Sequence, residues 1–206
     1  MNVKVCGITR LEDAQVAADL GAWAIGFIFH RKSPRYISPD DAFRIGERLR
    51  PDLLKVGVFV DYPLDKLNEV VSRAGLDGAQ LHGDESVEYA AAVDASLVVK
   101  VFRVGTGFDP DSVTSFSEHS ILLDTYQKDL YGGTGEVFDW SVARSVGDRS
   151  SFILSGGLNP DNVEEGIRAS RPAAVDVSSG VEVRPGIKDS GKLHEFFEAV
   201  LGAEAV

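Results

Sequence analysis

The 206-residue sequence has no long apolar run, no metal-site spacing and only one cysteine. It lacks both a run of about 18 apolar residues and a charged-then-apolar leader, so we expect no membrane span and no secretion signal. One cysteine excludes an internal disulfide. The four histidines are scattered along the chain, so we expect no bound metal and no cofactor. This composition is typical of a cytoplasmic protein.

Basic residues are also scarce: 21 lysines and arginines stand against 32 aspartates and glutamates, for a formal net charge of −11. Nucleic-acid binding requires a basic surface that replaces counterions, so we expect no nucleic-acid partner. An anionic ligand would have to be attracted by local groups rather than by the field of the whole protein. Arginine outnumbers lysine, which suits a surface adapted to concentrated salt, although ordinary solvated acidic helices explain the charge nearly as well.

Apolar runs rich in β-branched and aromatic residues alternate with amphipathic segments along the chain. Such runs are typical of strands covered on both faces. The eight candidate strands cover residues 3–6, 23–28, 54–60, 76–81, 97–102, 120–123, 152–154 and 174–177. They predict one domain, 1–206, folded as an α/β protein of the (βα)₈ TIM-barrel class and present as a monomer or homodimer. A doubly wound open sheet is the alternative, but its Gly-x-Gly-x-x-Gly motif is absent after the first strand.

Several helix starts are predicted from side chains that cap them. Thr9 and Glu12 have the spacing of a capping box after the first strand. Asp84 is expected to cap the helix that follows the fourth strand. Ser38 and Asp109 each precede a proline, which favours a helix start at both positions.

The first strand carries a lysine and the only cysteine on one face, because side chains alternate along a strand. Lys4 and Cys6 are thus about 6.6 Å apart along the strand. Cys6 lies at the carboxyl end, where barrels keep their chemistry, so it is a candidate reactive thiol. The alternative is a small buried hydrophobic residue, as lone cysteines usually are. Barrel closure places the eighth strand beside the first, which predicts a buried ion pair between Lys4 and Asp176.

Polar side chains also follow the second, fourth and sixth strands. Arg35 lies in a basic loop between a proline and a tyrosine, either holding a carboxylate through two parallel hydrogen bonds or solvated. Gln80 and His82 share a face that points into the barrel mouth, where His82 either lines a site or has a structural role. Asp124 ends an apolar strand, where burial favours the protonated carboxyl of a general acid, unless it is a turn or cap residue.

Glycine-rich segments follow the last three strands. Residues 128–135 form a long loop that we expect to act as a mobile cover over the site. The turns after the seventh and eighth strands offer backbone N–H groups to an anion, as in the common phosphate site of barrels. The candidate phosphate-binding residues are Gly156, Gly157, Ser178, Ser179 and Gly180.

Taken together, these segments resemble one family, phosphoribosylanthranilate isomerase, a (βα)₈ barrel of tryptophan biosynthesis. The similarity spans nearly the whole chain in the family's order. The matching segments are KVCGIT at 4–9, SPRYIS at 33–38, VGVFV at 56–60, QLHGDE at 80–85, LLDT at 122–125, GGTGEVFDW at 132–140, LSGGLNPDNV at 154–163 and DVSSGVEVRPGIKD at 176–189.

The resemblance implies a small phosphorylated substrate and an Amadori rearrangement, which converts N-(5'-phosphoribosyl)anthranilate into 1-(2-carboxyphenylamino)-1-deoxyribulose 5-phosphate. It implies that Asp124 is the general acid that opens the furanose ring and that Cys6 is the general base that removes the C2' proton. Since Cys6 has to lose its own proton, we expect Lys4 or a helix N-terminus to lower the pKa of the thiol.

The resemblance also implies how the substrate is held. Arg35 would bind the anthranilate carboxylate, and Gln80, His82 and Asp176 would line the substrate site. The phosphate would lie against the two glycine turns, that is, against Gly156, Gly157, Ser178, Ser179 and Gly180.

Other functions fit the sequence less well. A barrel lyase that closes an indole ring requires a catalytic lysine and glutamates at strand ends. A metal-dependent pentose-phosphate epimerase requires several converging histidines and aspartates, and only His82 is so placed. A non-catalytic phosphate-binding barrel needs neither Cys6 nor Asp124. One phosphate site rather than two argues against the analogous aminoimidazole carboxamide ribotide of histidine synthesis.

Overall fold

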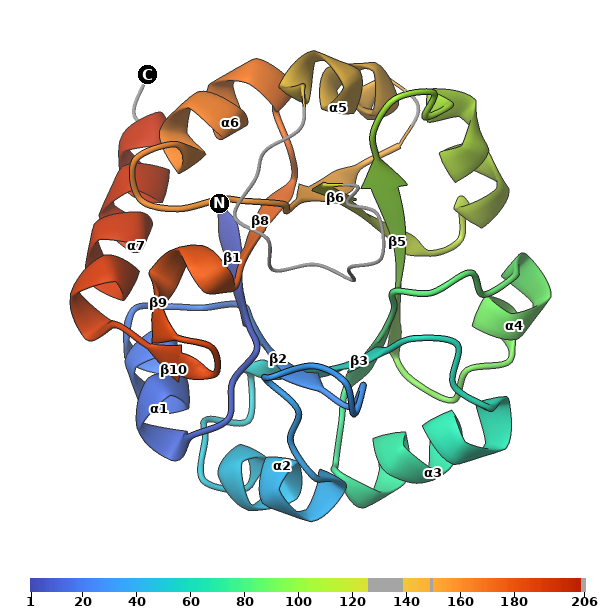
Figure 1. Cartoon of the computed structure of the whole chain (residues 1–206), viewed down its shortest axis with the longest axis vertical. Coiled ribbons are helices and arrows are strands. Elements are labelled where there is room, and N and C mark those ends of the chain that lie inside the picture. Colours follow the sequence, from blue (N-terminus) through green and yellow to red (C-terminus); the bar gives the residue numbers. More distant parts are fainter. Residues whose placement is uncertain (126–138, 149, 205–206) are drawn as a thin grey trace.

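Eight parallel strands close into a barrel in the computed structural model, which describes residues 1–125, 139–148 and 150–204 (Figure 1). The predicted barrel class and all eight predicted strands are confirmed, with ends that differ by at most two residues. The barrel closes because β1 pairs with β2 on one side and with β8 on the other. The strands are β1 Asn2–Cys6, β2 Ala24–Ile28, β3 Leu54–Phe59, β4 Gly78–Leu81, β5 Leu97–Val104, β6 Ser120–Thr125, β7 Phe152–Leu154 and β8 Ala174–Val177.

Helices surround the barrel on its outer face (Figure 1). They are α1 Leu11–Asp19, α2 Pro39–Gly46, α3 Leu64–Arg73, α4 Val87–Ala91, α5 Trp140–Gly147, α6 Val163–Ser170 and α7 Ser190–Glu204. A 3₁₀ helix, η1 Pro110–Phe116, connects β5 to β6 in place of an α-helix. Among the described residues, no helix has the length and apolar character needed to cross a bilayer.

A short hairpin was not predicted. After β8 the chain makes a turn of 3₁₀ helix, η2 Ser179–Val181, and then two antiparallel strands, β9 Glu182–Arg184 and β10 Ile187–Lys188. The hairpin lies close to α1 and to the start of the barrel (Figure 1). It carries two charged side chains that are buried beside the candidate site, Glu182 and Lys188.

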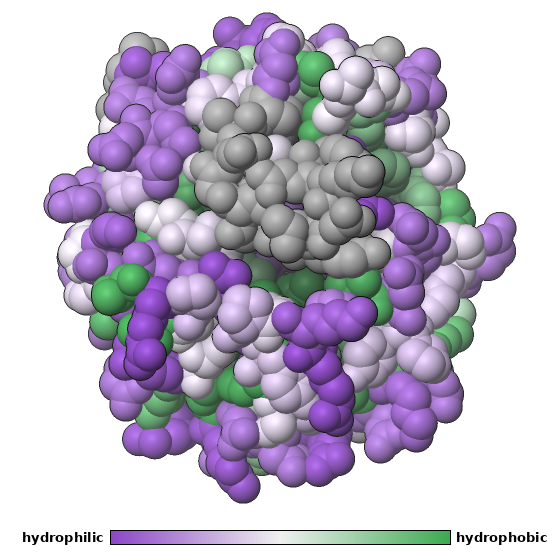
Figure 2. All heavy atoms as spheres, in the orientation of Figure 1, coloured by the Kyte–Doolittle hydropathy of each residue, from purple (hydrophilic) through white to green (hydrophobic). Residues whose placement is uncertain are grey.

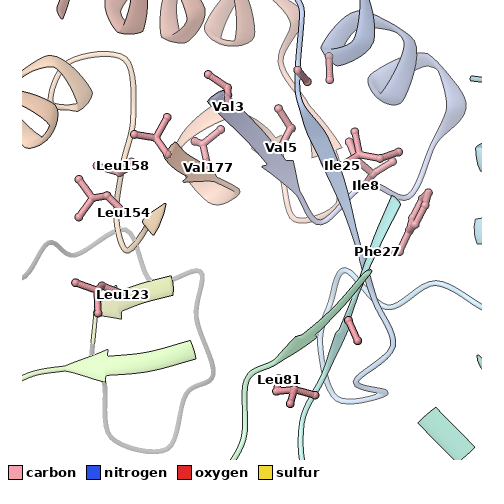
Figure 3. Close-up of a cluster of buried hydrophobic side chains, with 14 of the residues drawn as sticks. Val3, Val5, Ile8, Ile25, Phe27, Leu81, Leu123, Leu154, Leu158 and Val177 are labelled. Atoms are coloured by element: carbon pink, nitrogen blue, oxygen red, sulfur yellow. The ribbon is translucent and has the colours of Figure 1, made fainter. Parts of the chain in front are cut away.

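Alternation along the strands divides the buried side chains into two layers. Outward-facing residues such as Val5, Phe27 and Val177 pack against the helices in one large apolar cluster (Figure 3). Inward-facing residues form a second, smaller cluster inside the barrel, made of Val99, Val101, Leu122, Ile153 and Ala174. We call this smaller cluster the apolar floor. Polar side chains occupy the barrel interior between the floor and the carboxyl ends of the strands.

Two of the predicted helix caps are confirmed and two are wrong. Ser38 accepts a hydrogen bond from the Asp41 amide, and Asp109 accepts one from the Asp111 amide. The capping box at Thr9 does not form, because the Thr9 hydroxyl donates to the Gly186 carbonyl and Arg10 occupies the cap position.

Asp84 does not cap α4 either. Ser86 takes that position and accepts a hydrogen bond from the Tyr89 amide at 3.2 Å. Asp84 pairs instead with Arg103 at 2.7 Å. Figure 2 shows the end of the barrel that faces the viewer in Figure 1, where hydrophilic residues predominate among the coloured atoms and apolar residues are scattered.

Candidate active site

A cavity of about 470 Å³ opens at the carboxyl ends of the strands. Strand alternation explains its lining, because Cys6, Gln80, Asp124 and Asp176 all point into the barrel above the apolar floor. Of the eleven predicted site residues, all but Gly180 line the cavity: Cys6, Arg35, Gln80, His82, Asp124, Gly156, Gly157, Asp176, Ser178 and Ser179.

Cys6 lies directly above the predicted ion pair, which is confirmed. Lys4 Nζ is 2.9 Å from Asp176 Oδ1, and both side chains are buried. Burial would lower the pKa of Lys4, but Asp176 and Cys6 hold it above its ordinary value, so the ammonium keeps its proton. Gly26 on β2 lies opposite Cys6, and an added Cβ there would be 2.6 Å from the thiol sulfur. The absence of a side chain at this glycine makes room for the thiol.

The expected lowering of the Cys6 pKa is wrong in its net direction. Burial raises the pKa of the Cys6 thiol, and Asp176 adds to this. Lys4 and Lys188 both act in the opposite direction but do not outweigh burial. Lys4 is therefore the cationic neighbour that the sequence predicted, yet it only moderates the cost of a buried thiolate. A thiol of raised pKa is a stronger base once it has lost its proton.

Asp124 has different neighbours, contributed by the segment that follows β4 and by β6. Its Oδ2 is 3.1 Å from His82 Nε2, and its Oδ1 accepts a hydrogen bond from the Thr125 amide at 2.9 Å. Gln80 Nε2 is 3.4 Å from His82 Nδ1, so the three side chains form a row. The buried Oε1 of Gln80 has no hydrogen-bond partner among the described residues, so it is available to a ligand.

The two glycine turns lie beside the cavity as predicted. Gly156 and Gly157 have φ values of 85° and 72°, which favour glycine. The Asn162 side chain donates to the Gly157 carbonyl at 3.0 Å and so holds this turn at the start of α6. Gly180 does not line the cavity. An added Cβ at Gly180 would lie 1.9 Å from the Leu158 carbonyl oxygen, so its role is close packing between the two turns.

Arg35 is neither solvated nor free to use both edges of its guanidinium group. It is buried, and it makes the predicted pair of parallel hydrogen bonds with Glu182 rather than with a ligand. Its Nη1 has no partner in the part of the chain that the structure describes. That edge remains available for a carboxylate in the cavity.

Sequence reasoning missed Glu182, Lys188 and Gly26. The first two lie in Val-Glu-Val-Arg-Pro-Gly-Ile-Lys, where alternating apolar and charged residues flank Pro-Gly, a hairpin signal. The predicted cover at 128–135 lies outside the described residues. Within the described ranges, no group of three or more His, Cys, Asp or Glu side chains is placed to hold a metal ion.

Comparison with known proteins identifies the family. A family model described as N-(5'phosphoribosyl)anthranilate (PRA) isomerase matches residues 3–199. The N-(5'-phosphoribosyl)anthranilate isomerase of Geobacter metallireducens is 45% identical over 196 residues, which cover 95% of this chain and 96% of the relative.

Solved structures agree in fold and in sequence. Phosphoribosyl anthranilate isomerase from Thermus thermophilus is 40% identical, with a TM-score of 0.91, covering 98% of this chain and 99% of its own. A second phosphoribosyl anthranilate isomerase, in complex with reduced 1-(o-carboxyphenylamino)-1-deoxyribulose 5-phosphate, is 43% identical with a TM-score of 0.87, over 98% and 99% of the two chains. The chain therefore belongs to the N-(5'-phosphoribosyl)anthranilate isomerase family.

Proposed function

We propose that this isomerase converts N-(5'-phosphoribosyl)anthranilate into 1-(2-carboxyphenylamino)-1-deoxyribulose 5-phosphate in tryptophan biosynthesis, with Asp124 as general acid and Cys6 as general base. One observation carries the assignment of roles: a thiol from β1 and a carboxyl from β6 line the same cavity. The guanidinium group of Arg35 also lines that cavity and suits a carboxylate of the ligand. The two glycine turns suit a phosphate.

The first step is ring opening. The Asp124 carboxyl donates its proton to the furanose ring oxygen while the bond from C1' to that oxygen breaks. The lone pair of the anilino nitrogen forms the C1'=N bond of a protonated Schiff base. The carboxylate left on Asp124 accepts the hydrogen bond of the Thr125 amide, and His82 Nε2 lies 3.1 Å from its other oxygen.

The second step moves a proton from carbon. The Cys6 thiolate takes the C2' proton, and the electrons of that C–H bond form a C1'=C2' double bond as the nitrogen is neutralised. The resulting enolamine gains a proton at C1' and loses the proton of its C2' hydroxyl, which gives the ketone. Substrate and product have the same composition, so no oxidant or co-reactant is consumed.

Substrate binding uses the remaining lining residues. The Nη1 edge of Arg35 receives the anthranilate carboxylate, and the phosphate lies against Gly156, Gly157, Ser178 and Ser179. These local groups attract an anion despite the formal net charge of −11. Gln80, His82 and Asp176 line the part of the cavity where the sugar would lie.

The test is the loss of substrate fluorescence on addition of purified protein, with the substrate generated in situ and EDTA present, at low and at molar salt. We expect turnover in EDTA, and a slower rate when C2' carries deuterium, because Cys6 breaks that bond. A rate that requires molar salt would support the surface adapted to concentrated salt. No turnover at either salt concentration would contradict the proposed activity.

The other expectations remain predictions. They are a cytoplasmic location, no nucleic-acid partner, and a monomer or homodimer. A solved relative from Thermotoga maritima, 43% identical to this chain, is a dimeric protein that was also obtained as monomers. Light scattering on the purified protein, at the concentration used in the assay, would measure the oligomeric state of this chain.

A further inference from the structure

Arg35 is fixed along one edge by Glu182. Nε of Arg35 lies 2.9 and 3.1 Å from the two Glu182 carboxylate oxygens, and Nη2 lies 2.7 Å from Oε2. These hydrogen bonds to one carboxylate fix both the position of the guanidinium group and the orientation of its plane. The stem of Arg35 passes over Gly7, where an added Cβ would be 2.7 Å from Cδ of the arginine. The Nη1 edge, which has no partner among the described residues, is thereby held in a single orientation.

Glu182 has a second cationic partner on the opposite strand of the hairpin. Lys188 Nζ is 2.9 Å from Glu182 Oε1, and the lysine side chain is fully buried. Burial would raise the pKa of Glu182, but Arg35 and Lys188 hold it below its ordinary value, so the carboxylate stays charged. Burial lowers the pKa of Lys188, and Glu182 opposes this. The triad of Arg35, Glu182 and Lys188 sets two basic side chains against one carboxylate.

The triad also contacts the phosphate side of the cavity. Lys188 Nζ donates to the Ser178 carbonyl at 3.0 Å, and Ser178 lines the cavity. The hairpin itself is anchored to α1, because the Lys188 amide donates to Asp13 at 3.0 Å. Buried, hydrogen-bonded support of this kind keeps a binding group in one geometry.

We propose that Glu182 is a positioning residue for substrate recognition. Held between Arg35 and Lys188, it presents the Nη1 edge of Arg35 to the carboxylate on the aromatic ring of the substrate. Lys188 neutralises Glu182, so that the positive charge of Arg35 remains available, and it ties this end of the cavity to the phosphate turn. The inference rests on the proposed function, because that function supplies the carboxylate.

The experiment compares two ligands that differ only in that carboxylate. They are the reduced product, reduced 1-(o-carboxyphenylamino)-1-deoxyribulose 5-phosphate, and the same compound made from aniline. Dissociation constants are measured by calorimetry for the wild type, for Glu182→Gln and for Glu182→Asp. The control is Glu164→Gln, which removes a carboxylate from an exposed pair with Arg168 on α6.

We expect the wild type and Glu164→Gln to bind the carboxylate ligand about tenfold or more tightly than the aniline ligand. In Glu182→Gln this ratio falls to about threefold or less. Glu182→Asp keeps the charge but shortens the side chain, so its ratio falls too. A residue that only stabilised the fold would weaken both ligands alike and leave the ratio unchanged.

The inference is overturned if folded Glu182→Gln or Glu182→Asp keeps the wild-type ratio, or if the wild type binds both ligands equally. Circular dichroism establishes that each variant is folded, and the aspartate variant decides the question if the glutamine variant does not fold. Turnover of the natural substrate by the wild type is measured in parallel. Its absence would refute the proposed function, whereas turnover with an unchanged ratio would refute only the role of Glu182.

Discussion

The two groups proposed to move protons lie in opposite electrostatic surroundings. Cys6 has two buried lysines nearby, Lys4 and Lys188, each paired with a carboxylate of its own. Asp124 has a histidine and a backbone amide, and no lysine or arginine forms an ion pair with it among the described residues. The two lysines reduce the cost of a thiolate at Cys6, although burial outweighs them. The two sides of the barrel mouth thus differ in their neighbours: paired lysines lie near Cys6, and a histidine and a backbone amide lie beside Asp124.

The largest expected effect comes from removing either proton carrier. Asp124→Asn and Cys6→Ser should each lower kcat by about 10³-fold or more, because neither substituted group can transfer the proton. Binding of the reduced product should persist in Asp124→Asn although turnover is lost. A non-catalytic phosphate-binding barrel would bind this ligand equally well but would show no turnover in the wild type either. Asp52→Asn, at an exposed pair with Arg50, serves as the control. Full turnover in either active-site variant would contradict the assigned roles.

Removing the deeper lysine should affect stability as well as activity. Lys4→Met leaves Asp176 buried without its cation, so we expect the free energy of unfolding to fall by about 3–5 kcal/mol. Urea denaturation measures this. The double variant Lys4→Met with Asp176→Leu replaces the whole pair by apolar groups and should recover much of the loss. If Lys4→Met is as stable as the wild type, the ion pair does not support the barrel.

Lys188→Met tests the cationic surroundings of the thiol through pH. Burial raises the pKa of Cys6 and Lys188 opposes this, so removing the lysine should raise the pKa further. Activity requires the thiolate and falls as the pH drops below that pKa, so the acidic limb of kcat/KM should move to higher pH. Thiolate absorbance in the ultraviolet reports the same titration. An unchanged acidic limb would show that Lys188 does not affect the pKa of Cys6.

The smallest effect is expected from removing His82, the neighbour of the proposed acid. His82→Asn removes one neighbour of Asp124 but leaves the Thr125 amide, so kcat should fall by about three- to tenfold. The ultraviolet titration of the thiolate should not move, because the described contacts of His82 are with Gln80 and Asp124. A shift of that titration would show that the two surroundings are coupled.

The barrel could be predicted from the sequence because each strand is buried on both faces. Near-continuous apolar runs mark such strands directly, and closure of the barrel then places β8 beside β1. That single step of topology was enough to predict the ion pair between Lys4 and Asp176. The failures came from contacts made outside the local segment. Thr9, for example, has the spacing of a cap, but its hydroxyl bonds a carbonyl 177 residues away.

The lining of the site was predictable where strand alternation decides it, as at Cys6, Gln80 and Asp124. The partner of Arg35 was not, because Glu182 lies 147 residues along the chain on a hairpin that is not part of the barrel. The direction of the Cys6 pKa also required the structure. A nearby lysine is visible in the sequence, but the depth of burial that outweighs it is not.

The pair formed by Lys4 and Asp176 joins positions 172 residues apart, the first strand of the barrel to the last. During synthesis β1 exists long before β8, and contacts of such sequence separation form late in folding. Until β8 pairs with β1, Lys4 therefore has no Asp176 to pair with, and Cys6 lies at an open edge of the sheet. The accessibility of this lone thiol to an alkylating reagent thus reports the moment at which the barrel closes.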